Sequence, residues 1–387
     1  MISHISKILF KKTLPIALLI LSLISTNKVF AFETEAKQAL VVDYDTGAVL
    51  YSKNAEVLMH PSSMSKIMTL YIAFRAIKDG NLKLEDSFVV SNKAWKMGGS
   101  RMFLQVGDTV KVVDLIRGIV VQSGNDACVA LAEGMYGDEQ TFVEHMNKAA
   151  IDLGLTNSKF VNSTGWPDEN HLMTAIDLAK LARVMIKEFA DFYPYFSDKE
   201  MTYNNITQQN RNTLIGFYGV DGIKTGHTDA GGYGVVLSAK RNGHRIIAVI
   251  NGLSNMAKRA ENANKILNYT FSNFQWNKIY AQGDAISKIK VKYGNKPEII
   301  ATVDSDLYIA IPKETKTADL VSVHPYVDVE APMAKGDVLG EVVVLQPSLD
   351  SSKSWATPLV ALNDVKKGNW IQILWQKAEK IWKKYAK

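Results

Sequence analysis

Cysteine is almost absent from this chain of 387 residues, since Cys128 is its single example. One cysteine cannot form a disulfide within the chain, so the fold cannot depend on such cross-links. Cys128 lies in the apolar run Ala127–Ala132, which predicts a buried thiol that packs as a small hydrophobic side chain. The chain must therefore fold by apolar packing, and it is long enough for two domains with their own cores.

Two catalytic signatures are also missing. The sequence has no His-Glu-x-x-His pattern, and its seven histidines are scattered without the spacing of metal ligands. It has no Gly-x-Ser-x-Gly elbow either, which argues against a serine-protease triad of that kind. We therefore expect neither a metal nor an organic cofactor.

A long apolar run is missing as well. The run from Leu14 to Ile24 stays short of the roughly 20 residues that a membrane span needs. It follows Lys11 and Lys12 and is followed by small residues near Ala31, which is the pattern of a secretory signal. We predict that residues 1–31 are a signal peptide and that the protein is exported; a membrane anchor is the alternative.

Strong net charge is missing once this leader is set aside. The full chain carries +6, but residues 32–387 carry only +2, and residues 364–387 alone carry +5. The body of the protein is therefore slightly acidic. Because the basic residues gather at the two ends, nucleic-acid binding is not expected.

Residues 32–276 mix strand and helix patterns. A hairpin is predicted from residues 39–44 and 49–52, and two further strands from 234–239 and 245–250. Helical patterns cover residues 67–77, 110–118, 127–135, 177–189 and 255–274. A mixed sheet packed against helices, of the α+β class, follows from this arrangement.

The pattern changes near residue 277. Ile289, Val291 and Tyr293 alternate with lysines, and Leu307, Ile309 and Ile311 alternate in the same way, which is the period of half-exposed strands. We predict a small all-β domain at residues 277–362.

Residues 363–387 predict an amphipathic helix. Apolar residues recur there at spacings of three and four, and lysines and glutamines fill the other face; the apolar positions are Trp370, Ile371, Leu374, Trp375, Ala378, Ile381, Trp382 and Tyr385. Three tryptophans beside a lysine-rich face favour a helix that lies on an anionic membrane surface. A helix that faces the core is the alternative.

Three short polar motifs occur in order along the chain: Ser63-Met64-Ser65-Lys66, Ser123-Gly124-Asn125 and Lys224-Thr225-Gly226. The first is a weak signal alone, since Ser-x-x-Lys also begins at Ser25 and Ser287. Only the copy at Ser63 opens a helix pattern, and there Lys66 shares a face with Ser63 and can reach its hydroxyl. A helix N-terminus also supplies N–H groups and positive potential for developing negative charge. The combination predicts a nucleophilic serine.

In context these motifs resemble the low-molecular-mass penicillin-binding proteins, and more narrowly the D-alanyl-D-alanine carboxypeptidases of peptidase family S11. The resemblance rests on Pro61–Thr69, Ser123–Cys128 and Asp221–Thr228, with support from Asn162–Leu178. It covers nearly all of residues 32–387. It implies a penicillin-recognising serine-enzyme domain with an antiparallel sheet and a helical block at residues 32–276, then the all-β domain and the helix.

The resemblance also implies catalytic roles. Ser63 would be the nucleophile that forms an acyl-enzyme, Lys66 its base, and Ser123 the relay of a proton to the leaving D-alanine. Lys66 must be neutral to act, and burial beside another cation, Lys224, would lower its pKa. Which residue serves as the base is disputed in related enzymes, so Lys66 is one choice among them.

Further residues would bind the substrate. Asn125 would hold a peptide amide, and the backbone N–H groups of Ser63 and His227 would form the oxyanion hole. Gly226 would let the substrate backbone approach closely.

The terminal carboxylate of the substrate would be bound by Lys224 and Thr225, so that only the last residue is cut. Arg211 and Arg259 are weaker candidates for the same task, and solvated surface arginines are the alternative.

The implied function is removal of the terminal D-alanine from peptidoglycan stem pentapeptides, in cell-wall biogenesis and cell shape. β-Lactam antibiotics would acylate the same serine, and the enzyme would be peripheral to the periplasmic face of the cytoplasmic membrane. One alternative is a β-lactamase, for which Glu169 could activate water. The other is a catalytically silent scaffold of the cell envelope.

Overall fold

The computed structural model describes residues 32–385, and the predicted signal peptide lies outside them. Its first sheet has five strands in the order β2-β1-β9-β8-β7, all antiparallel. Their bounds are β1 (Gln38–Asp43), β2 (Val49–Lys53), β7 (Val220–Thr228), β8 (Gly232–Arg241) and β9 (His244–Leu253). The N-terminal hairpin thus joins strands that follow some 200 residues later, and β7 is left at the edge.

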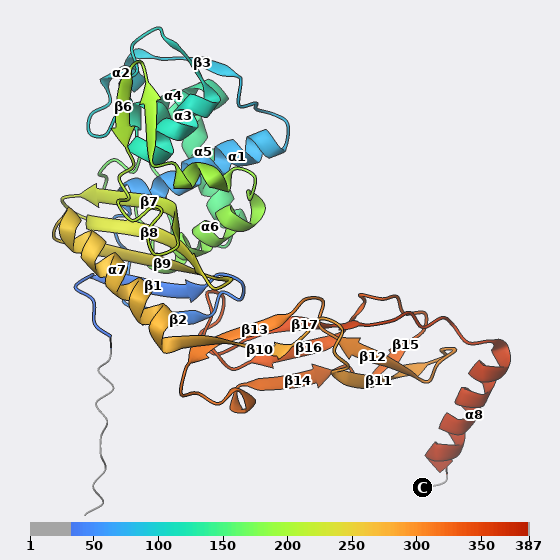
Figure 1. Ribbon diagram of the computed structural model, residues 1–387. Coiled ribbons are helices and arrows are strands. Elements are labelled where there is room, and N and C mark those ends of the chain that lie inside the picture. The colour runs from blue at the N-terminus through green and yellow to red at the C-terminus, as the bar shows by residue number, and fades with distance from the viewer. Residues whose placement is uncertain (1–31, 386–387) are drawn as a thin grey trace, which may run out of the picture. The chain divides into compact units, whose positions relative to one another are not determined.

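Helices cover both faces of this sheet. The helix α7 (Met256–Asn273) lies across β8 and β9, whereas α6 (Ala175–Glu188) packs against β9 and β1 from the other side (Figure 1). Beyond α6 lies α1 (Lys66–Lys78), whose residues from Lys66 to Phe74 are all buried. A helix that is enclosed on every side is held by packing rather than by its own propensity.

A helical block stands at the β7 side of the sheet (Figure 1). It contains α2 (Asn92–Lys96), α3 (Val112–Arg117), α4 (Asn125–Tyr136) and α5 (Glu139–Asp152), with the short hairpins β3 (Ser87–Val89)–β4 (Thr109–Lys111) and β5 (Glu200–Tyr203)–β6 (Ile206–Gln209). Cys128 is fully buried within α4, as predicted.

Two helices differ from the sequence predictions. The predicted helix at residues 110–118 begins only at Val112, because Val110 lies in β4 and pairs with Phe88 across a short hairpin. The helix α5 was not predicted at all. Its stripe of Phe142, Val143 and Met146 and its N-cap Asp138, which accepts a hydrogen bond from the Thr141 amide, were signals that the sequence carried.

The C-terminal β domain begins with β10 (Phe274–Tyr280), which pairs with β13 (Leu307–Pro312). A six-stranded sheet follows in the order β14-β16-β17-β12-β11-β15. Its strands are β11 (Ser287–Lys292), β12 (Glu298–Thr302), β14 (Val321–Pro325), β15 (Asp328–Glu330), β16 (Val338–Val344) and β17 (Trp355–Ala361). Ile289 and Val291 are buried while Lys288 and Lys290 are exposed, which confirms the predicted alternation.

The last element is α8 (Trp370–Tyr385), in the segment that predicted an amphipathic helix. Among the described residues, no helix combines the length and the apolar character that a membrane span requires.

Candidate active site

The first motif forms a 3-10 turn, η1 (Ser62–Ser65), that continues directly into α1. The Lys66 amine makes three hydrogen bonds: to Ser63 Oγ at 2.8 Å, to Asn125 Oδ1 at 2.7 Å, and to the Thr164 carbonyl oxygen. Burial, the largest effect, lowers the pKa of Lys66 to about 8, although Cys128 and Asp126 act in the opposite direction. Near neutral pH a useful fraction of this amine is therefore uncharged and able to accept a proton.

The second motif follows a π-helical turn, η2 (Gly118–Gln122), that ends α3. Ser123 itself is left-handed, with φ of +66°, a conformation that non-glycine residues rarely adopt outside functional sites. Its Oγ is buried and has no hydrogen-bond partner in the described structure. Ser123 is among the residues that line the cleft, and its hydroxyl has no bond within the described structure that a bound molecule would have to replace.

Asn125, the first residue of α4, is fixed by three hydrogen bonds. Its Oδ1 accepts from Lys66, its Nδ2 donates to the Gly98 carbonyl at 2.8 Å, and its backbone N–H donates to the Ser100 carbonyl at 2.7 Å. The carboxamide therefore links the base to the loop that forms one wall of the cleft.

The third motif lies on the edge strand β7. Lys224 is buried, and burial together with the nearby Lys66 lowers its pKa well below the usual value. The tight contact at Gly226 is with the protein itself, since a Cβ there would lie 2.8 Å from the Pro61 carbonyl oxygen. A side chain at Gly226 would displace the turn that carries Ser63.

Two arginines complete a cationic end of the site. Arg259, only 7% exposed, donates from Nη2 to the Arg211 carbonyl at 3.0 Å, and both residues line the cleft. Burial lowers the pKa of Arg259 to about 10, and the charge of Arg211 acts in the same direction. Positive charges this close together favour a bound anion.

The cleft has a volume of about 490 Å³ and brings the three motifs together. All the predicted site residues line it except Lys66 and Lys224, which stand buried behind its surface. Five consecutive residues of the β7 end, Thr225–Asp229, form one side. Within the described residues, no cluster of His, Cys, Asp or Glu side chains could hold a metal ion.

The sequence analysis assigned no role to three residues at the site. Thr164 presents its carbonyl to Lys66, Trp166 lines the cleft and packs near Gly99, and the Tyr233 ring stacks on His227 with centroids 3.8 Å apart. The turn that carries Thr164 and Trp166 did have a local signal. Asn162 Oδ1 accepts from the backbone N–H groups of both residues, which is the behaviour of an asparagine that caps a turn.

Glu169, the residue that raised the β-lactamase alternative, is exposed. It lines a neighbouring cavity of about 320 Å³ and not the cleft that contains Ser63. The structure therefore does not place it as a base that activates water at an acyl-enzyme.

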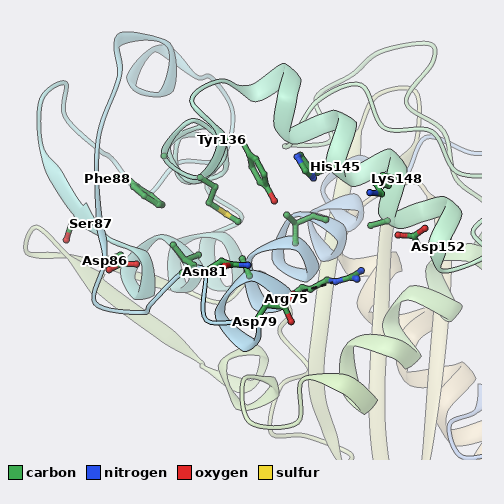
Figure 2. A pocket seen from close by; sticks show the side chains of 16 residues that line it. Arg75, Asp79, Asn81, Asp86, Ser87, Phe88, Tyr136, His145, Lys148 and Asp152 are labelled. Carbon is green, nitrogen blue, oxygen red and sulfur yellow. Dashed lines mark ion pairs between the residues drawn. The ribbon is translucent and has the colours of Figure 1, made fainter.

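A separate cavity of about 720 Å³ lies where α1 and α4 end (Figure 2). Its wall includes Arg75, which pairs with Asp79 at 4.0 Å, and Tyr136, which stacks on His145. Acidic and basic side chains are mixed there, and none of its serine or lysine residues is part of the three motifs. Chemistry is therefore centred on the cleft at Ser63.

The comparisons with known proteins agree with this geometry. The family model of D-alanyl-D-alanine carboxypeptidase, peptidase S11, matches residues 25–255, and that of the penicillin-binding protein 5 C-terminal domain matches residues 274–367. The chain is 37% identical to D-alanyl-D-alanine carboxypeptidase DacF of Bacillus subtilis, with 88% of each chain covered. It is 36% identical to DacA of Haemophilus influenzae, also over 88% of each.

Solved structures show the same relationship. Penicillin-binding protein 5 of Haemophilus influenzae superposes with a TM-score of 0.77 at 35% identity, over 87% of this chain and 99% of that one. Penicillin-binding protein D2 of Listeria monocytogenes, solved with ampicillin bound, gives a TM-score of 0.58 at 26% identity, over 62% of this chain and 99% of that one. The chain therefore belongs to peptidase family S11, the D-alanyl-D-alanine carboxypeptidases, and is a serine hydrolase.

Proposed function

We propose that this enzyme removes the terminal D-alanine from peptidoglycan pentapeptides through an acyl-enzyme on Ser63, and that penicillins acylate the same serine. The observation that carries the proposal is the Lys66 amine, buried and 2.8 Å from Ser63 Oγ. A serine hydroxyl is a weak nucleophile unless a base removes its proton, and a buried lysine of lowered pKa is such a base.

The geometry around Lys66 supports its role in the first step. A neutral amine has two N–H bonds and one lone pair. If Asn125 Oδ1 and the Thr164 carbonyl each accept a hydrogen bond from one of these N–H groups, the lone pair faces the Ser63 hydroxyl. The Ser63 proton then passes to Lys66 as Oγ bonds to the scissile carbonyl carbon, while the N–H groups of Ser63 and His227 would stabilise the oxyanion.

We assign Ser123 to the second half of acylation. As the C–N bond breaks, the leaving D-alanine nitrogen needs a proton, and the unpartnered Ser123 Oγ can pass it on from Lys66. Water then attacks the ester carbonyl and gives one proton to Lys66, which passes it to Ser63 Oγ as the ester C–O bond breaks, so that the shortened peptide, the free Ser63 hydroxyl and neutral Lys66 result.

The cationic end of the cleft supports exopeptidase specificity. Arg211, Arg259 and Thr225 line the end where a substrate carboxylate would lie, with the Lys224 amine buried behind. Because β7 is an edge strand, an extended peptide can pair with its free side. A substrate whose carboxylate occupies this end presents only its last peptide bond to Ser63.

The test replaces Ser63 with alanine. We expect Ser63→Ala to lose both labelling by a fluorescent penicillin and release of D-alanine from a defined pentapeptide, as followed by mass spectrometry. The matched control is Ser287→Ala, because Ser287 begins another Ser-x-x-Lys sequence but lies in β11. Labelling or D-alanine release that persists in Ser63→Ala would exclude the serine mechanism.

We also propose that α8 holds the exported enzyme on the periplasmic face of the membrane. The helix contacts the β domain through a polar residue, since Gln376 Oε1 accepts a hydrogen bond from the Tyr293 amide at 2.6 Å. Its three tryptophans, Trp370, Trp375 and Trp382, are each more than 70% exposed. Indole side chains beside lysines suit the boundary between lipid headgroups and acyl chains.

A further inference from the structure

The Thr164 carbonyl oxygen helps to orient the Lys66 amine. Among the described residues, it and Asn125 Oδ1 are the two acceptors that can bond to the N–H groups of a neutral Lys66 and so leave its lone pair facing Ser63. Asn125 supplies the other acceptor and lies at the start of a long helix, so its position is secured by packing. Thr164 is also buried, but it lies in a loop between α5 and α6, where Asn162 Oδ1 accepts hydrogen bonds from its N–H and hydroxyl. The orientation of the Lys66 lone pair therefore depends on the contacts that hold this loop in place.

Ser163, the neighbour of Thr164, is fully buried, and its carbonyl, its backbone N–H and its hydroxyl all form hydrogen bonds. Its carbonyl accepts a hydrogen bond from Thr69 Oγ1 at 2.6 Å. Thr69 lies one turn after Lys66 on α1, so two side chains of one helix hold two successive carbonyls of the loop. The backbone N–H and the hydroxyl of Ser163 bond to a different partner, outside α1.

Both of these groups donate to a single carboxylate oxygen, Glu139 Oε1, at 2.9 Å and 2.6 Å. The second oxygen, Oε2, lies 2.8 Å from Lys93 Nζ. Although burial raises the pKa of Glu139, the hydrogen bonds from Lys93 and Ser163 outweigh it and lower the pKa, so the group is a carboxylate at neutral pH. Glu139 is also the first residue of α5, where the helix dipole favours a negative charge.

We propose that Glu139 is a positioning residue for catalysis: it holds Ser163 and thereby fixes the Thr164 carbonyl that orients the Lys66 amine toward Ser63. Glu139 does not line the cleft and so acts through these neighbours rather than on the substrate. The proposal rests on the role of Lys66 as base in the function proposed above.

The test separates binding from acylation with benzylpenicillin in stopped-flow measurements on the full chain. Glu139→Leu removes both carboxylate oxygens but keeps a side chain of similar size. We expect its acylation rate constant to fall by about ten- to a hundredfold, because small errors in the placement of reacting groups slow a reaction strongly. The dissociation constant of the non-covalent complex should stay within about twofold. Glu139→Gln keeps an oxygen that can accept from Ser163 and should restore most of the rate.

The matched control is Lys93→Met, which removes the ion pair on the other carboxylate oxygen but leaves both Ser163 hydrogen bonds. We expect it to lower the melting temperature and to acylate at the wild-type rate. If Glu139→Leu does not fold, Ser163→Ala, which loses only the hydroxyl donor, should still slow acylation by about three- to tenfold. A wild-type rate in a folded Glu139→Leu or in Ser163→Ala, or an equal loss in Lys93→Met, would overturn the proposal.

The readout also keeps the two proposals apart. If the wild-type enzyme reacts with benzylpenicillin but releases no D-alanine from the pentapeptide, the proposed substrate is wrong, while the effect of Glu139 on acylation can still be measured.

Discussion

Lys66 and Lys224 show that the same residue type can serve opposite purposes within one cleft. Both are buried, and burial is the largest cause of the lowered pKa in each case. Lys66, however, is hydrogen-bonded to Ser63 Oγ and to two acceptors, Asn125 Oδ1 and the Thr164 carbonyl, whereas within the described residues the Lys224 amine donates one hydrogen bond, to the Thr225 carbonyl at 3.2 Å. Lys224 therefore keeps donors for an incoming carboxylate.

The lowered pKa of Lys66 predicts a pH dependence. The base must be neutral, and below a pKa of about 8 the neutral fraction falls by roughly tenfold for each pH unit. We expect the rate constant for acylation by benzylpenicillin to fall between pH 8 and pH 6 and to level off above pH 8. Stopped-flow measurements across this range check it, and a flat profile from pH 6 to pH 9 would show that another group is the base.

Residues of the site differ in how well a sequence can reveal them. Ser63 and Lys66 are three apart on one helix start, so their spacing alone predicts contact. Glu139 accepts a hydrogen bond from the backbone N–H of Ser163, 24 residues away in the sequence, and the backbone carbonyl of Thr164 accepts one from Lys66, 98 residues away. Hydrogen bonds between residues so far apart leave no local sequence pattern. The pair Ser63 and Lys66 could be predicted from the sequence, but the hydrogen bonds of Glu139 and Thr164 that hold Lys66 in its orientation could not.

At the scale of elements, periodicity predicted α1, α4, α6 and α7 because their apolar stripes are long. Short elements were missed or misplaced for the opposite reason. In the segment from Thr109 to Arg117 three residues of strand pass directly into helix, and valines satisfy both patterns. The π turn before Ser123 likewise has no sequence signature, although it sets the direction in which that serine points.

The helix α8 permits a prediction about membrane association. A chain that ends at Gly368 keeps the Asn295–Lys366 and Tyr293–Gly368 backbone hydrogen bonds of the β domain but loses the tryptophan-rich face. We expect it to remain soluble, to keep wild-type D-alanine release, and to stop co-sedimenting with vesicles that contain anionic lipid.

The control for this prediction keeps the helix. In the full chain, Trp375→Glu places a charge on the exposed apolar face, because Trp375 is 73% exposed. This variant should also lose vesicle binding. If the shortened chain still binds vesicles, another surface or the leader anchors the enzyme.

For the molecule as a whole, the site is assembled from segments far apart in the chain around one sheet. Ser63 and Lys66 come from η1 and the start of α1, and Ser123 and Asn125 come from the helical block. The cationic end comes from β7, from α7 and from Arg211 in the segment between β6 and β7. The β domain matches the C-terminal domain of penicillin-binding protein 5, so the likeness extends beyond the part of the chain that carries the three motifs.

The position of Glu169 predicts how the penicillin adduct behaves. Glu169 is exposed and lies outside the cleft, and none of the described residues that line the cleft is a glutamate that could activate water as in class A β-lactamases. We expect a long-lived penicilloyl-enzyme, followed by intact-mass spectrometry over hours, and the same lifetime in Glu169→Gln. Rapid hydrolysis that disappears in Glu169→Gln would instead support a β-lactamase.

The open edge of β7 has one more consequence, for solubility. Edge strands can pair with the sheets of other molecules, which leads to aggregation. Here the last four residues of β7, Thr225–Thr228, line the cleft, and the strand also packs against η1 and η3 (Tyr193–Ser197).

At the opposite edge, a segment of the β domain covers the start of β2: the Val49 amide donates to the Pro347 carbonyl at 2.7 Å, and the Leu349 amide to the Gly47 carbonyl at 3.0 Å. A short peptide can therefore reach the free stretch of β7, whereas a full strand from a neighbouring sheet finds too little edge at either side. The shape that admits the substrate thus also protects the enzyme from aggregation.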